Sequence, residues 1–303
     1  MAAPTPVIIN GAAGLGHTEA ECENLQAIFR AIGVETRILP ARSGEDLRAI
    51  AQRVAQDKPA AIVAGGGDGT ISAVASVLAG SDIALGVLPL GTLNHFAKDL
   101  RIPLDLAEAA RTIAAAHVVD VDVGEVNGRV FLNNSSLGLY PDIVRGRQHQ
   151  QRLLGRGKWP ALFWATWTTL RRSPFLNVRL CLDAEEQQYR STFVFIGNNE
   201  YVMKGFNIGV RERLNAGHLS LYVTQRRGRL GLLLLGLRAL FRHLDQADDF
   251  DAKTAQRIIV ETRHRRLHVA TDGEVTVMDT PLEYRVRARA LRVITPRAGQ
   301  TRP

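Results

Sequence analysis

The first chemically suggestive feature is a glycine-rich segment between a predicted strand and a predicted helix. Gly65-Gly66-Gly67-Asp68-Gly69-Thr70 follows the apolar run Ala60–Ala64 and precedes the helical pattern Thr70–Leu78. Consecutive glycines let a backbone approach a ligand closely, and their N–H groups form an anion site together with a helix N-terminus. The carboxylate of Asp68 would repel phosphate unless a divalent cation lay between them, which predicts Mg²⁺ with a nucleotide. The segment is not a Walker A loop, because it lacks the Gly-Lys-Ser/Thr ending. The alternative to a nucleotide site is a plain strand-to-helix turn.

A second polar turn follows the next predicted strand, Ala84–Leu88. Its sequence is Pro89-Leu90-Gly91-Thr92-Leu93-Asn94-His95-Phe96-Ala97. Ligands of open parallel sheets bind outside the carboxyl ends of the strands, so this turn and the glycine-rich segment could face one nucleotide. Ordinary turn chemistry would also account for Thr92 and Asn94.

A third feature is the acidic turn Thr271-Asp272-Gly273-Glu274. Asp-Gly between the predicted strands Leu267–Ala270 and Val275–Met278 is typical of a β-hairpin. The functional alternative is a site of paired carboxylates, with Asp272 as a base and Glu274 supporting it or the metal.

In the first part of the chain, which holds the first two motifs, short apolar runs alternate with amphipathic segments. This pattern predicts a mainly parallel sheet covered by helices. Thr18 with Glu21, and Ser43 with Asp46, are patterns typical of helix starts, and Asp105 is expected to cap Leu106–Ala115. The predicted strands are Val7–Ile9, Arg37–Leu39, Ala60–Ala64 and Ala84–Leu88.

The pattern changes after residue 118, where strands predominate. Val118–Val126 and Arg129–Asn133 flank Asn127-Gly128, a strong hairpin signal. A largely antiparallel β domain is therefore predicted, with two helical insertions near Pro160–Leu170 and Leu230–Leu244. Its further predicted strands are Asn177–Leu182, Thr192–Ile196, His218–Val223, Arg257–Glu261, Leu267–Ala270, Leu282–Val286 and Ala290–Ile294.

Composition places the chain among ordinary globular proteins. It has 303 residues, of which 46% are hydrophobic and 22% charged, which argues against disorder, a coiled coil or collagen. Cys22 and Cys181 fit neither a metal site nor a disulfide framework and are expected to be free thiols in a reducing cytoplasm. No signal peptide and no run of 18 apolar residues are evident, so a cytoplasmic protein is predicted.

Charge is unevenly distributed along the chain. Residues 1–125 carry a net charge of −6, whereas 126–225 and 226–303 carry +7 each. A basic surface could face nucleic acid or anionic lipid, or simply remain solvated.

The three motifs together resemble the diacylglycerol kinase catalytic family, specifically the bacterial soluble lipid kinases related to sphingosine and ceramide kinases. The resemblance covers almost the whole chain. It runs from Ile8-Ile9-Asn10-Gly11-Ala12-Ala13-Gly14, similar to the family's Asn-Pro-x-x-Gly turn, through Gly66–Thr70 and Pro89–Ala97 to Asp272-Gly273-Glu274. NAD kinases and phosphofructokinases share the glycine-rich loop, but Gly91-Thr92-x-Asn94-x-Phe96-Ala97 favours the lipid branch.

The resemblance implies an α/β fold with an N-terminal parallel-sheet nucleotide domain (1–119), a C-terminal antiparallel β-sandwich lipid-substrate domain (120–288) and a cleft between them. A final strand within 289–303 would return to the first domain. It also implies site residues. Asp68 would organise Mg·ATP as the metal-binding carboxylate, and Asp272 would be the general base with Glu274 beside it. The nucleotide would be bound by Asn10, Gly66, Gly67, Gly69, Thr70, Thr92 and Asn94.

The sequence departs from the family pattern at three places. His95 stands where the family often has an aspartate, which removes a possible charge from the metal network. Gly11 stands where proline is usual. The family's Asp-Gly turn that can hold a structural Mg²⁺ appears here as Asn215-Ala216-Gly217, so no structural metal is predicted in the second domain.

Both helical insertions combine apolar and basic side chains. Trp159, Phe163, Trp164 and Trp167 precede Arg171 and Arg172, and the leucine-rich segment 230–244 contains Arg238 and Arg242. These segments could lie at an anionic membrane surface or line an acyl site, or be helices packed on the β domain.

The sequence thus favours a cytoplasmic, ATP- and Mg²⁺-dependent lipid kinase of lipid metabolism, peripheral at the inner membrane face and not a nucleic-acid-binding protein. Its acceptor would be the hydroxyl of diacylglycerol or a similar lipid. One alternative is a kinase of a soluble acceptor such as NAD; another is a non-catalytic nucleotide- or lipid-sensing relative.

Overall fold

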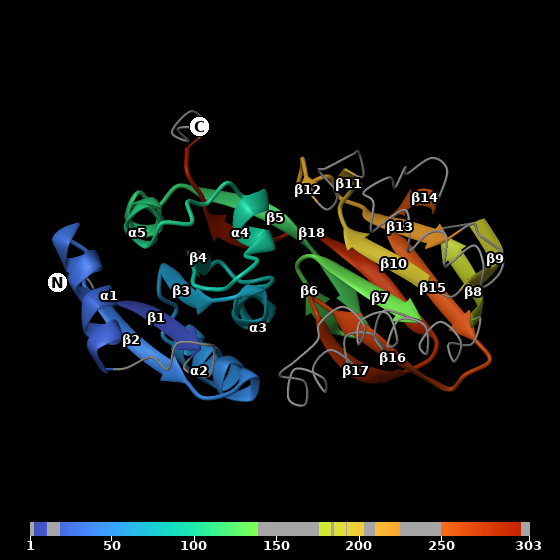
Figure 1. Ribbon diagram of the computed structural model, residues 1–303, viewed down its shortest axis with the longest axis horizontal. Coiled ribbons are helices and arrows are strands. Elements are labelled where there is room, and N and C mark those ends of the chain that lie inside the picture. The colour runs from blue at the N-terminus through green and yellow to red at the C-terminus, as the bar shows by residue number, and fades with distance from the viewer. Residues whose placement is uncertain are drawn as a thin grey trace, which may run out of the picture. The chain divides into compact units, whose positions relative to one another are not determined.

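The computed structural model describes residues 3–10, 19–138, 176–182, 185–191, 193–202, 210–224 and 250–297. The chain forms two compact units (Figure 1). The first comprises Met1–Val123 with Arg287–Pro303, and the second comprises Gly124–Val286. The strands β5 (Val118–Val126) and β18 (Leu282–Ile294) contribute residues to both units.

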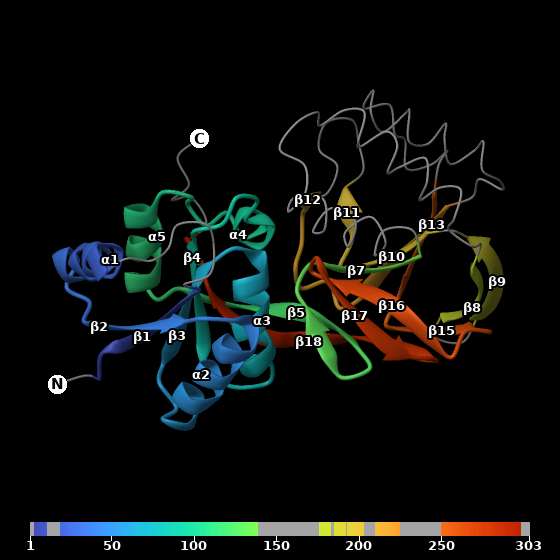
Figure 2. The same ribbon diagram turned by 60° about the horizontal axis from the view of Figure 1, so that its bottom comes forward.

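The first unit is built on a parallel sheet of order β2-β1-β3-β4, and the end of β18 pairs in parallel with β4 through Val293 and Leu85. Helix α1 contacts α5 and α2 contacts α3, so these four helices cover the sheet as two pairs (Figure 2). The strands are β1 (Thr5–Asn10), β2 (Thr36–Ala41), β3 (Ala61–Gly66) and β4 (Ala84–Pro89). The helices are α1 (Glu19–Ala31), α2 (Gly44–Gln56), α3 (Asp68–Leu78), α4 (His95–Asp99) and α5 (Leu106–Ala114).

Two of these helices begin where their side chains predict. The hydroxyl of Ser43 accepts a hydrogen bond from the N–H of Asp46 at 3.1 Å, and the Asp105 carboxylate accepts one from the N–H of Glu108 at 3.0 Å. Each bond satisfies an amide that has no partner within its helix.

The second unit is an antiparallel sandwich. One sheet has the order β14-β13-β10-β7-β16-β17, and β18 pairs on one side with β5 and on the other with β15, which continues to β8 and β9. Both sheets supply side chains to one apolar core, including Leu137 and Ile196 from the first, and Val260 and Tyr284 from the second. The remaining strands are β6 (Arg129–Phe131), β7 (Asn134–Gly138), β8 (Leu176–Leu182), β9 (Glu185–Ser191), β10 (Phe193–Asn198), β11 (Tyr201–Val202), β12 (Val210–Arg211), β13 (Leu219–Thr224), β14 (Phe250–Ala255), β15 (Arg257–Thr262), β16 (Arg266–Thr271) and β17 (Glu274–Asp279).

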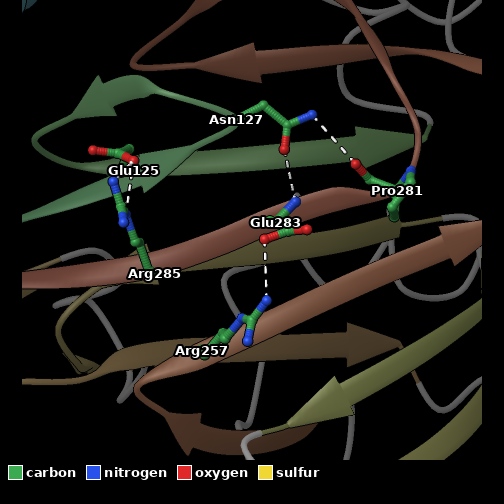
Figure 3. Close-up of polar contacts among 6 residues, drawn as sticks. All are labelled: Glu125, Asn127, Arg257, Pro281, Glu283 and Arg285. Atoms are coloured by element: carbon green, nitrogen blue, oxygen red, sulfur yellow. Dashed lines mark hydrogen bonds and ion pairs between the residues drawn. The ribbon is translucent and has the colours of Figure 1, made fainter.

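The hairpin between β5 and β6 is fastened to β18 at its tip. The Asn127 side chain accepts from the N–H of Glu283 at 2.8 Å and donates to the carbonyl of Pro281 at 3.3 Å (Figure 3). Two ion pairs connect β18 to its neighbours: Arg257 of β15 with Glu283, and Glu125 of β5 with Arg285 (Figure 3). The predicted Asn-Gly turn therefore also fixes the hairpin against its neighbouring strand.

The predicted α/β unit followed by an antiparallel β unit is confirmed, with some local differences. The segments predicted as separate strands, 282–286 and 290–294, form one strand, β18. The irregularity between them is local: Arg289 has a φ of +51°, and its N–H donates to the buried Asp122 carboxylate at 2.8 Å. Helix α4 and the strands β7, β9, β11, β12 and β14 were not predicted.

Several predictions concern residues outside the described ranges, namely Thr18 of the first helix-start pattern and both helical insertions. Cys22 and Cys181 are free thiols. Within the described residues, no helix has the length and apolar character needed to span a bilayer.

Candidate functional site

The candidate nucleotide site lies where the strand order of the first unit reverses. The chain passes from β1 to β2 on one side and then to β3 on the other, and ligands of open α/β sheets bind at such a point, outside the carboxyl ends of the strands. Asn10 ends β1 and Gly66 ends β3, and the neighbouring pair Ile9 and Gly65 are in register. Gly66 is in turn paired with Pro89, the last residue of β4.

The N-terminus of α3 opens at this edge without a side-chain cap. The residue before the helix is Gly67, which has no side chain to accept from the first amides, so the N–H groups of Asp68 and Gly69 have no intrahelical partner. Thr70 is buried, with only 3% of the residue exposed, and its hydroxyl has no hydrogen-bond partner among the described residues. Uncapped amides and the helix dipole favour an anion here.

Asp68 links this helix to α4. Its carboxylate accepts from the backbone N–H of His95 at 3.2 Å and of Phe96 at 3.0 Å. The contact at position 95 is made by the backbone, so it does not depend on whether histidine or aspartate stands there. A carboxylate has about four lone-pair positions, so these two amides leave Asp68 able to accept further bonds.

The Asp68 carboxylate suits a Mg²⁺ ion that is bound by phosphate oxygens at the same time. Among the described residues no cluster of three metal-ligating side chains exists. Mg²⁺ commonly uses only one or two carboxylates together with phosphate oxygens and waters. Asp68, beside uncapped amides that favour phosphate, would be one carboxylate of such a donor set.

The second loop, Leu90–Asn94, packs directly on the first. The N–H of Leu90 donates to the carbonyl of Gly66 at 3.1 Å, and Gly91 lies against the backbone of Gly67. Asn94 is buried with a φ of +50°, and its side chain accepts from the N–H of Gly91 at 3.0 Å and donates to the Gly91 carbonyl at 2.7 Å. Asn94 therefore shapes the loop from within, whereas the predicted residue Thr92 is exposed.

Asp272 lies at the tip of the β16–β17 hairpin in the second unit. Asp272 and Gly273 have φ values of +47° and +84°, as the predicted two-residue turn requires. The carboxylate accepts from three consecutive backbone amides: Leu132 at 2.8 Å, Asn133 at 2.8 Å and Asn134 at 3.2 Å. These three hydrogen bonds fix the orientation of the carboxylate, and they are stronger than bonds to a neutral acceptor because a carboxylate is charged.

The surroundings of this hairpin include an ion pair and a buried phenol. Glu274 forms an ion pair with Arg129 at 2.6 Å. Tyr284 is fully buried, and its hydroxyl is 3.0 Å from the hydroxyl of Ser135, which is in register with Thr271 of the hairpin. Burial raises the pKa of the Tyr284 phenol.

The structure thus brings Asn10, Gly66, Gly67, Asp68, Gly69, Thr70, Thr92 and Asn94 to one sheet edge of the first unit, and Asp272 and Glu274 to one hairpin of the second. Sequence reasoning missed the segment 132–134 that holds Asp272. The polar run Asn133-Asn134-Ser135-Ser136, in otherwise apolar strand sequence, was the available signal.

Comparison with known proteins matches two family profiles to consecutive parts of the chain. "Diacylglycerol kinase catalytic domain" matches residues 4–126, and "YegS C-terminal NAD kinase beta sandwich-like domain" matches residues 147–295. The chain is 35% identical over 128 residues to "Probable lipid kinase YegS-like" of Klebsiella pneumoniae (strain 342), which covers 41% of this chain and 43% of that protein. It is 36% identical over 119 residues to "Diacylglycerol kinase" of Bacillus subtilis (strain 168), covering 38% and 39%. The matched segments thus span less than half of the length of these curated relatives.

Solved structures resemble the whole chain. A diacylglycerol kinase from Bacillus anthracis str. Sterne aligns with a TM-score of 0.69 and 22% identity, covering 97% of both chains. Another structure from that organism has a TM-score of 0.74 at 24% identity, covering 97% of this chain and 96% of its own. At these identities the likeness shows a shared fold.

Proposed function

This chain belongs to the diacylglycerol kinase catalytic family, and on that premise we propose that it is a lipid kinase that transfers the γ-phosphoryl group of ATP to a lipid hydroxyl. The observation that carries the proposal is the Asp68 carboxylate, which lies at the uncapped N-terminus of α3 and bonds to the amides of α4. A carboxylate among phosphate-favouring amides suits a nucleotide that arrives with a divalent cation.

In this proposal the first unit binds the nucleotide. The first-turn amides of α3 and the Thr70 hydroxyl would bind phosphate oxygens, and the contact between Gly67 and Gly91 would keep both loops on one ligand. Asp68 would hold Mg²⁺, which when bound neutralises charge on the phosphates.

The second unit would supply Asp272 to the acceptor hydroxyl. The lipid oxygen forms a bond to the γ-phosphorus, the bond from phosphorus to the β–γ bridging oxygen breaks, ADP leaves, and the hydroxyl proton passes to the Asp272 carboxylate. Phosphoryl transfer has a loose transition state that needs little nucleophile deprotonation. A carboxylate held by three amides therefore suffices, because orientation matters more here than basicity.

A second candidate function is phosphorylation of a soluble acceptor such as NAD. It is favoured by the second matching profile, which is described as NAD kinase beta sandwich-like. The two functions differ in the acceptor and share the nucleotide site.

Incubation of the pure protein with γ-labelled ATP, Mg²⁺ and either diacylglycerol-containing vesicles or NAD distinguishes them. We expect label in the organic phase, abolished when Mg²⁺ is chelated. Label in NAD would favour the second function, and binding of ATP without transfer to any acceptor, including a panel of lipid alcohols, would indicate a sensing protein.

A lipid acceptor also requires contact with a membrane surface. We propose that the chain docks peripherally on anionic lipid at the inner membrane face, since residues 126–303 carry a net +14 while residues 1–125 carry −6. Each basic side chain near an anionic surface contributes about 1 kcal/mol. The arginines expected to make this contact, Arg171, Arg172, Arg238 and Arg242, lie outside the described residues.

Co-sedimentation with vesicles tests this docking. Binding to anionic vesicles should weaken as salt is raised, because salt screens charge, and binding to neutral vesicles should be much weaker. Equal, salt-independent binding to both would contradict it.

A further inference from the structure

Arg211, on the short strand β12, is only 2% exposed and is the largest fully buried side chain among the residues that the structure describes. A guanidinium stays charged in proteins, so its burial requires compensating bonds. It donates to the carbonyl of Leu132 at 2.7 Å, to the carbonyl of Asn198 at 3.0 Å and to the side-chain oxygen of Asn133 at 2.7 Å. Its guanidinium also lies 5.3 Å from the ring centre of Tyr201.

Arg211 and Asp272 engage opposite ends of the same peptide group. The peptide between Leu132 and Asn133 presents its carbonyl oxygen to Arg211 and its N–H, at 2.8 Å, to the Asp272 carboxylate. The same carbonyl accepts a second bond from the Asn198 side chain at 2.9 Å. A cation at the oxygen polarises the peptide so that its N–H becomes a stronger donor, because hydrogen bonds in such chains reinforce one another.

The side chain of Asn133 adds a second connection. Its Oδ1 accepts from Arg211, while its backbone N–H is one of the three amides that hold Asp272. Arg211 thus fixes both the carbonyl side and a side chain of the segment 132–134, whose N–H groups all point to one carboxylate.

We propose that Arg211 is a positioning residue for phosphoryl transfer, acting on Asp272 through the peptide group between Leu132 and Asn133. This inference rests on the proposed function, in which Asp272 contacts the acceptor hydroxyl. Arg211 holds in place the Asp272 cradle, which is the set of three backbone amides of residues 132–134 that bond to the carboxylate. The neighbouring ion pair of Arg129 with Glu274 at 2.6 Å is separate from this chain of bonds.

A double-mutant cycle tests the connection. Arg211→Lys keeps the charge but loses the planar fork that bonds three oxygens, and Asn133→Ala removes one guanidinium acceptor while leaving the backbone amide. Each is made in the wild type and in Asp272→Asn, and kcat and the KM for ATP are measured for lipid phosphorylation. Ser220→Ala is the matched control: its buried hydroxyl bonds to the carbonyl of Asn199 at 2.6 Å, in the same region but away from segment 132–134.

We expect Arg211→Lys to lower kcat by about 10- to 100-fold, since small misplacements of a reacting group cost this much, with the KM for ATP within about twofold of wild type. Asn133→Ala should have a smaller effect in the same direction. Both effects should disappear in the Asp272→Asn background, whereas Ser220→Ala should leave kcat unchanged. An equal fall in kcat in both backgrounds, or an unchanged kcat in Arg211→Lys, would overturn the proposal.

Hydrogen exchange at the amides of residues 132–134 gives a readout that does not depend on activity. Exchange should be faster in Arg211→Lys and Asn133→Ala than in the wild type, and unchanged in Ser220→Ala. Unaltered exchange in Arg211→Lys would overturn the positioning role even if kinase activity is found. Absence of transfer by the wild type to any acceptor would instead overturn the proposed function, and the exchange data would still decide whether Arg211 holds the Asp272 cradle.

Discussion

A single methyl group at position 91 should disturb the contact between the two loops of the candidate nucleotide site. In Gly91→Ala the new Cβ would lie 2.8 Å from Oδ1 of Asn94 and 3.1 Å from the backbone nitrogen of Gly67, and closer still to the Gly67 Cα. Two of these three atoms are backbone, so the clash cannot be relieved by a rotamer change. The loops must separate, or the Asn94 side chain must leave its bond to the N–H of residue 91.

The magnitude follows from these contacts. Overpacking costs about 1–3 kcal/mol, and loss of the Asn94 hydrogen bond adds about 0.5–1.5 kcal/mol. We therefore expect Gly91→Ala to lower the free energy of unfolding by about 2–4 kcal/mol. Gly44→Ala is the control, because a Cβ there meets nothing within 4 Å and Gly44 is the first residue of α2, where alanine is at least as favourable as glycine.

Urea unfolding of the full chain measures the stability, and the KM for ATP measures the site at a temperature where both variants are folded. Gly91→Ala should raise this KM several-fold, and Gly44→Ala should leave it unchanged. Unaltered stability of Gly91→Ala would refute the packing argument. A loss of stability with an unchanged KM would refute the assignment of these loops to the nucleotide.

Three further outcomes are expected. Asp272→Asn replaces one carboxylate oxygen by an NH₂ donor that faces a backbone amide such as that of Leu132. The free energy of unfolding should therefore fall by about 1–3 kcal/mol, and kcat should fall by about 10²–10⁴. A folded variant with near-normal kcat would contradict the role of Asp272. Asp68→Ala should weaken binding of Mg·ATP more than binding of metal-free ATP in parallel titrations, and an unchanged dependence on Mg²⁺ would leave Asp68 as a cap of α4 only. In the wild type, the free energy of unfolding should fall as pH rises above the ordinary tyrosine pKa of 10.0. Burial raises the pKa of Tyr284 in the folded state, so the unfolded state releases the proton first. Urea unfolding at alkaline pH should show a shallower fall for Tyr284→Phe, and parallel curves for the two proteins would refute this role of Tyr284.

Local sequence signals predict the elements whose determinants are close in the chain. Ser43 and Asp46 mark the start of α2, and the turns Asn127-Gly128 and Asp272-Gly273 have the positive φ values that these residue pairs favour. Each depends on residues no more than four apart, so a pattern in the sequence is sufficient.

The elements that were missed depend on distant partners. Helix α4 has five residues, and its first amides are capped by Asp68, which is 27 and 28 residues away from His95 and Phe96. The predicted break between 286 and 290 is only a local irregularity of one strand, β18, where the Arg289 N–H bonds to Asp122, 167 residues away. No local rule for helix starts or strand breaks can find such contacts, because the partner belongs to another element of the fold.

The candidate site shows the same division. The glycine-rich and acidic turns could be located from residue type and spacing, but the environment of Asp272 could not, since its three donors lie 138 to 140 residues away. Arg211 was likewise hidden, because a lone arginine in a sequence is ordinarily an exposed side chain and only the fold shows it buried behind the Asp272 cradle.

Phosphorus NMR of the reaction products tests most directly whether this protein transfers a phosphoryl group from ATP to a lipid hydroxyl. The pure protein is incubated with Mg·ATP and a lipid that carries one free hydroxyl, and the organic and aqueous phases are recorded separately. We expect a phosphomonoester resonance in the lipid phase, equal in amount to the ADP formed. ADP accompanied only by inorganic phosphate, or a phosphomonoester on a soluble acceptor in place of the lipid, would contradict it.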